Sequence, residues 1–67
     1  MNISITEAFN QVVEEQKIDL NSKYAKSESY VCLIHMFDLF DLSGMNIYET
    51  KLFVEYVESF VYSKFNV

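Results

Sequence analysis

The sequence predicts an all-α fold, a small three-helix domain with a central, largely buried second helix. The chain of 67 residues contains no proline and one glycine, so few residues interrupt helix formation. Apolar residues recur at helical spacing in the first and last thirds of the chain. Between these segments lies a nearly continuous apolar run, which is typical of a buried helix. We expect one domain over residues 1–67.

The first helix is expected at about residues 5–18. Ser4 and Glu7 have the spacing of a capping box, in which two side chains bond the free N–H groups at a helix start. Apolar residues then follow on one stripe at helical spacing, namely Ile5, Ala8, Phe9, Val12 and Val13. Asn and Ser within residues 19–23 favour turns, so a connection is expected there.

The second helix is expected at about residues 27–42, although the polar residues before it also allow a start at Ser22. From Tyr30 to Phe40 the side chains are apolar nearly all round the helix. Three polar residues share a narrow arc: Glu28, His35 and Asp38. A buried strand is the alternative for residues 30–34, but the length of the run favours a helix. Gly44 is expected to take the left-handed conformation that ends this helix.

The third helix is expected at about residues 47–64. Asn46 is a favourable N-cap, and Glu49 lies at the position that completes a capping box. The helix has a broad apolar face, made of Leu52, Phe53, Val54, Tyr56, Val57, Phe60 and Val61. This face is wider than one packing seam requires, which indicates a surface that binds something beyond the domain's own core.

Composition and charge narrow the classes of partner. Half of the chain (51%) is apolar, and a small domain buries only about 60% of its surface, so we expect a homodimer or another apolar interface. Ten acidic residues against five lysines give a net charge of −5, which opposes direct binding to nucleic acid or to an anionic membrane and favours a basic protein partner. Neither a signal peptide nor a membrane span is recognised, so a cytoplasmic location is expected.

The segment from Phe37 to Glu49 has the outline of a calcium-binding loop, with acidic residues around Gly44. An EF-hand loop needs oxygen ligands at six defined positions, with glycine at the sixth. No register of this segment supplies more than two or three side-chain oxygens. We therefore predict no metal and no cofactor here.

The same segment could join the helices of a DNA-binding helix-turn-helix. Phe40 opposes this interpretation, because it stands where that motif takes a small residue. The helix after Gly44 also opens without arginine, which commonly reads bases. Cys32 and His35, three residues apart, could form a nucleophile pair, but an apolar run disfavours the thiolate. We expect the protein not to be an enzyme.

A partner-binding surface is predicted on the outer side of the third helix. Tyr48, Glu55 and Tyr62 are spaced by seven residues and therefore lie near one line, with Lys51 and Glu58 beside them. Tyrosine is frequent in interfaces because it combines a large apolar ring with a polar tip. We predict that these five residues contact another protein.

These features favour a small acidic protein-interaction module that regulates or inhibits another protein, of the kind that phages and mobile elements encode. One alternative is an acidic nucleic-acid mimic that blocks a DNA- or RNA-binding protein. Its carboxylates would come from Glu7, Glu14 and Glu15 in the first helix and from Glu49, Glu55 and Glu58 in the third. A helix-turn-helix DNA binder and a self-assembling structural subunit are the remaining alternatives.

Overall fold

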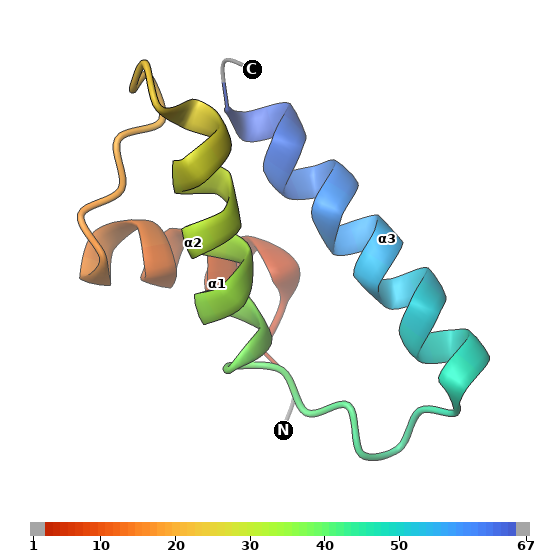
Figure 1. Cartoon of the computed structure of the whole chain (residues 1–67). Helices are drawn as coiled ribbons and strands as arrows, with labels where there is room; N and C mark the ends of the chain where they lie inside the picture. The colour runs from red at the N-terminus through yellow and green to blue at the C-terminus, as the bar shows by residue number, and fades with distance from the viewer. Residues whose placement is uncertain (1–2, 66–67) are drawn as a thin grey trace.

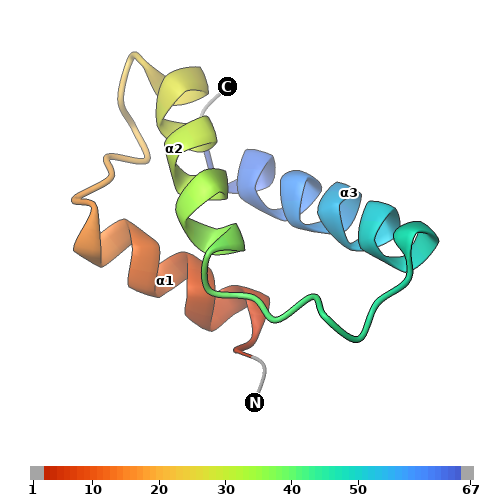
Figure 2. The same ribbon diagram turned by 60° about the horizontal axis from the view of Figure 1, so that its bottom comes forward.

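The computed structural model describes residues 3–65, so the first two and last two residues of the predicted domain lie outside it. Three helices follow one another: α1 (Ile5–Glu15), α2 (Ala25–Phe37) and α3 (Ile47–Lys64). No strand occurs in this part of the chain, and residues 30–34 are helical. In Figures 1 and 2, α2 lies between α1 and α3, and the chain direction reverses from α2 to α3. The prediction of an all-α three-helix fold is confirmed.

The two ends of α1 are fixed by different devices. At its start the Ser4 hydroxyl accepts a hydrogen bond from the Glu7 N–H at 3.1 Å and donates one to the Glu7 carboxylate at 3.0 Å. The carboxylate thus bonds the Ser4 hydroxyl instead of the backbone N–H that a capping box uses. At the other end Lys17 adopts a left-handed conformation with φ of 53°. The Ile18 N–H then bonds the Val13 carbonyl at 3.0 Å, the pattern of a Schellman motif.

Helix α2 contributes more buried residues than either neighbour, and they share one face: Ala25, Ser29, Cys32, Leu33 and Met36. The apolar circumference expected from the sequence is only partly covered, however. Ile34 is 64% exposed, Tyr30 47% and Val31 40%. This helix therefore carries a buried face and an exposed apolar face.

The expected role of Gly44 in ending α2 is wrong. The helix ends at Phe37, five residues before the predicted end at 42, and Asp38 caps it in a right-handed conformation. Gly44 has no positive φ, and a Cβ at this position would meet no atom within 4 Å. A turn organised by Asp41 lies in the connection, where its carboxylate accepts hydrogen bonds from the Ser43 N–H at 3.1 Å and the Ser43 hydroxyl at 2.6 Å. Together these two bonds lower the pKa of Asp41.

Helix α3 begins with the predicted capping box. The Asn46 side chain accepts from the Glu49 N–H at 2.8 Å, while the Asn46 N–H donates to the Glu49 carboxylate at 3.1 Å. These two bonds satisfy N–H groups that a helix start leaves free, and they fix where α3 departs from the connection.

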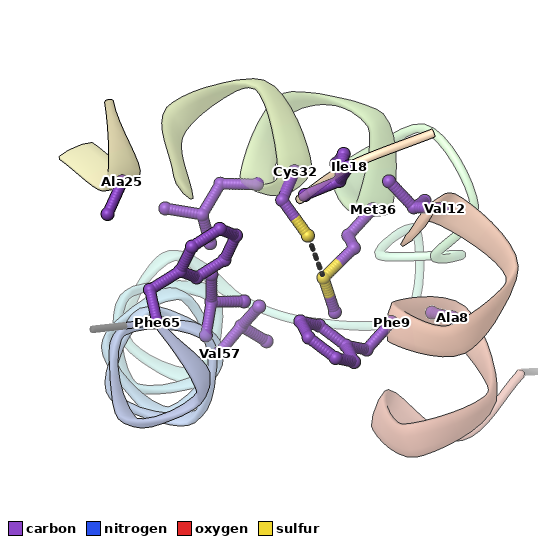
Figure 3. Packing of buried hydrophobic residues seen from close by; sticks show 11 residues of the cluster. Ala8, Phe9, Val12, Ile18, Ala25, Cys32, Met36, Val57 and Phe65 are labelled. Carbon is purple, nitrogen blue, oxygen red and sulfur yellow. Dashed lines mark hydrogen bonds between the residues drawn. The ribbon is translucent and has the colours of Figure 1, made fainter. Parts of the chain in front are cut away.

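The core lies where the three helices face one another (Figure 3). Cys32 and Met36 of α2 are fully buried, and the Cys32 thiol contacts the Met36 sulfur at 3.7 Å. Phe9 of α1 packs edge-to-face on Phe60 of α3, with ring centroids 5.6 Å apart. In the described residues no buried polar side-chain atom lacks a hydrogen-bond partner. Among the described residues the core thus contains eleven buried hydrophobic side chains, which come from all three helices and from Ile18 and Phe65 just beyond α1 and α3.

Candidate functional site

An open apolar groove runs between α2 and α3. Its volume is about 340 Å³, and seven residues line it: Tyr30, Leu33, Ile34, Phe37, Val54, Glu58 and Tyr62. The four from α2 have the spacing i, i+3, i+4, i+7, and the three from α3 have the spacing i, i+4, i+8. Each set therefore lies on one side of its helix. Two helix faces that both carry large side chains form the walls.

The floor and rim of the groove differ in exposure. Leu33 is buried, while Ile34 and Tyr30 project from α2 and remain largely in contact with solvent. Phe37 and Val54 are intermediate. Scattered exposed apolar residues are ordinary on a protein surface, but here they adjoin one another around a depression. This arrangement suits the side chains of a docked macromolecule.

The α3 wall of the groove is polar from its middle to one end. Glu58, which is partly buried, lies beside Tyr62, and Tyr30 lies near them on α2. Desolvation of the phenol, followed by the negative charge of Glu58, raises the pKa of Tyr62 above its ordinary value of 10.0. Tyr62 therefore stays neutral and can donate a hydrogen bond at any physiological pH. Glu58 is the only carboxylate among the lining residues.

The five residues predicted to bind a partner fall into two groups. Glu58 and Tyr62 line the groove, whereas Tyr48, Lys51 and Glu55 are exposed on α3 and do not line it. Tyr48 is 68% exposed, and with Leu52 and Tyr56 it forms an exposed stripe at i, i+4, i+8. Sequence reasoning missed the α2 wall of the groove. The signal was the apolar pattern all round that helix, because one buried face cannot remove all of these apolar side chains from water.

A second, smaller depression of about 80 Å³ lies under the connection between α2 and α3. It is lined by Ile3, Phe40, Asp41, Leu42, Met45 and Phe53. Phe40 stacks edge-to-face on both Phe37 and Phe53, with centroid distances of 5.9 and 5.0 Å. These aromatic contacts hold the connection against the helices, so we interpret this region as structural.

The lone cysteine does not form a reactive site. Burial raises the pKa of the Cys32 thiol to about 11, which leaves it protonated near neutral pH. Its sulfur contacts Met36 within the core, while His35 is only partly buried. Among residues 3–65, no group of three or more His, Cys, Asp or Glu side chains could hold a metal ion.

The connection between α2 and α3 comprises residues 38–46, nine residues in all. A helix-turn-helix joins its helices with a turn of about three or four residues, so this longer connection differs from that motif. No helix in the described part of the chain has both the length and the apolar character needed to cross a membrane.

Comparisons of this chain with family models, with curated proteins and with solved structures found no match.

Proposed function

We propose that this chain is a small protein-interaction module that regulates or inhibits another protein, and that the groove between α2 and α3 is its binding surface. The observation that carries the proposal is the exposure of Ile34 and Tyr30 beside the buried Leu33. When a partner removes apolar side chains from water, the burial favours binding by about 25 cal/mol per Å² of apolar surface. Tyr30 and Tyr62 add rings of the kind that often dominate binding energy.

A matched pair of substitutions on α2 tests the groove. Ile34→Ser removes a large side chain from the groove, while Val31→Ser changes a β-branched, exposed residue of the same helix that does not line it. Serine has the same effect on helix propensity at both positions. The tagged protein and its two variants are used to capture partners from cells that encode it, and the amount of each captured protein is quantified by mass spectrometry.

The expected result is a partner whose recovery falls about tenfold with Ile34→Ser, a loss of about 1.4 kcal/mol, and stays nearly unchanged with Val31→Ser. Circular dichroism checks that both variants keep the helical content of the parent. A partner captured equally well by both variants would show that binding occurs elsewhere.

A nucleic-acid mimic remains the second candidate, because five of its six predicted carboxylates are exposed: Glu7, Glu14, Glu15, Glu49 and Glu55. A mimic binds through charge, so its complex with a nucleic-acid-binding protein dissociates as salt is raised. A complex made in the groove depends mainly on apolar burial at Ile34, so Ile34→Ser weakens it at low and at high salt. A salt titration of the complexes captured by the parent and by Ile34→Ser, together with Glu55→Lys, distinguishes the two.

A further inference from the structure

We propose that the groove binds a basic amphipathic helix, one that places an apolar stripe between α2 and α3 and a lysine or arginine against Glu58. The inference rests on the proposed function and specifies the partner of that same site. Three properties of the groove lead to it: its length and form, the carboxylate in its wall, and the charge of the whole chain.

The length of the groove matches two turns of helix. Its α2 wall extends from Tyr30 to Phe37, and its α3 wall from Val54 to Tyr62. Seven or eight residues of helix rise about 10–12 Å, so an occupant with apolar residues at i, i+3 or i+4, and i+7 fits between the walls. The described residues contain no strand. A peptide that binds by adding a strand to a sheet edge would find no edge here.

Glu58 sets the charge of the occupant. It is partly buried in an otherwise apolar wall, beside the neutral phenol of Tyr62. A purely apolar surface laid over this wall would remove the remaining water from the carboxylate and offer nothing in return, which is unfavourable. A lysine or arginine at the matching position replaces that water with a charge-assisted hydrogen bond. The complement of the groove is therefore apolar along its length and carries a cation midway along the side that faces α3.

A second copy of this chain is a poorer complement. Each copy carries a net charge of −5, so two copies repel each other at long range. Two of the five lysines also lie over aromatic rings of their own chain, Lys23 on Tyr24 at 5.3 Å and Lys64 on Phe60 at 5.1 Å. A basic helix of another protein is attracted by the same field that opposes self-association.

Three synthetic peptides test the inference. Each is a helix of about 14 residues, or four turns, with an identical leucine stripe. Their polar faces consist of lysine, glutamine or glutamate. Binding of fluorescein-labelled peptide to the intact protein is measured by anisotropy at about 0.15 M salt, where the Debye length is about 8 Å. We expect the lysine peptide to bind tightest and the glutamate peptide weakest, with about a tenfold difference or more between them.

Two charge variants separate the local effect of Glu58 from net charge. Glu58→Gln and Glu55→Gln each remove one negative charge from α3, but only Glu58 lines the groove. We expect Glu58→Gln to weaken binding of the lysine peptide about threefold to tenfold and to leave binding of the glutamine peptide unchanged. We expect Glu55→Gln to have little effect on the binding of either peptide. Ile34→Ser should weaken both peptides.

Each contrary result has a distinct meaning. Equal effects of Glu58→Gln and Glu55→Gln would overturn the inference, because attraction would then come from net charge alone. Equal binding of the lysine and glutamine peptides, both sensitive to Ile34→Ser, would overturn the basic partner but support the groove as a binding surface. A chain that dimerises in sedimentation, and becomes monomeric with Ile34→Ser, would identify a second copy as the occupant. If a captured partner requires Ile34 but none of the peptides competes with it, the groove still binds that partner, and only the proposal that the occupant is a helix is overturned.

Discussion

The two apolar faces of α2 have similar side chains but different surroundings. One face places Cys32 and Met36 among residues of α1 and α3, where both are fully buried (Figure 3). The other places Tyr30 and Ile34 at the groove, where both remain exposed. An apolar side chain contributes to folding only through the surface that folding removes from water. The first face therefore stabilises the domain, and the second leaves apolar surface in contact with solvent, which is the surface we propose a partner covers.

The largest expected effect comes from truncating the buried face. Met36→Ala removes a fully buried side chain and leaves a cavity, which lowers the free energy of unfolding by about 2–5 kcal/mol. A domain of this size has about 3–10 kcal/mol in total, so the variant loses a large part of its stability. Urea denaturation followed by circular dichroism measures the change.

Ile34→Ala is the matched control on the groove face, since it truncates an aliphatic residue of the same helix. Because Ile34 is largely exposed already, we expect a change within about 0.5 kcal/mol. If the two variants were destabilised equally, Ile34 would belong to the core and the distinction between the faces would be lost.

A smaller effect on stability is expected at Lys17, in the turn that follows the end of α1. Lys17 holds a left-handed conformation that glycine adopts without a steric penalty, and Ile18, the next residue, is buried in the core. Lys17→Gly should therefore raise the free energy of unfolding by about 0.5–1 kcal/mol and leave peptide binding at the groove unchanged.

The single glycine provides the matched comparison for that substitution. Gly44 needs neither a positive φ nor the space of a missing Cβ. Gly44→Ala should raise stability by about 0.4–1 kcal/mol, because alanine restricts the unfolded chain more than glycine does. Thermal unfolding of both variants measures the two effects. Destabilisation by Lys17→Gly would mean that the lysine side chain makes contacts that outweigh its backbone strain.

The sequence predicted those features that depend on local spacing. Asn46 and Glu49 are three residues apart and formed the capping box, and the apolar stripe around Phe9 and Val12 formed the inner face of α1. The early end of α2 was not predictable in this way. Residues after Phe37 continue the apolar pattern, but Phe40 packs on Phe37 and Phe53 from the connection instead of from a helix. Tertiary contacts override a local pattern there.

The candidate site was only half predictable for a similar reason. Glu58 and Tyr62 were predicted from their positions on α3, but Tyr30 and Ile34 were assigned to a buried helix. Hydrophobicity alone does not distinguish an apolar face that packs inside the domain from one that stays exposed, because both faces contain the same types of residue. The distinction depends on how α1 and α3 share the circumference of α2, which is a property of the packed structure.

The smallest expected effect is a change in the pKa of Tyr62, which lines the groove. Desolvation and the charge of Glu58 both raise the pKa of Tyr62, so the folded protein favours the neutral phenol. This contribution to stability is complete below pH 10.0, the ordinary value, and is lost as the pH rises through the higher value of the folded state. Glu58→Gln should lower the pKa of Tyr62 toward 10.0 without reaching it, because desolvation is the larger cause and remains. Phenolate absorbance gives the titration, with Tyr62→Phe to assign the residue and Glu55→Gln as the charge control. An equal shift from Glu55→Gln would place the charge that Tyr62 senses outside the groove, and the local carboxylate on which the basic-helix proposal depends would lose its support.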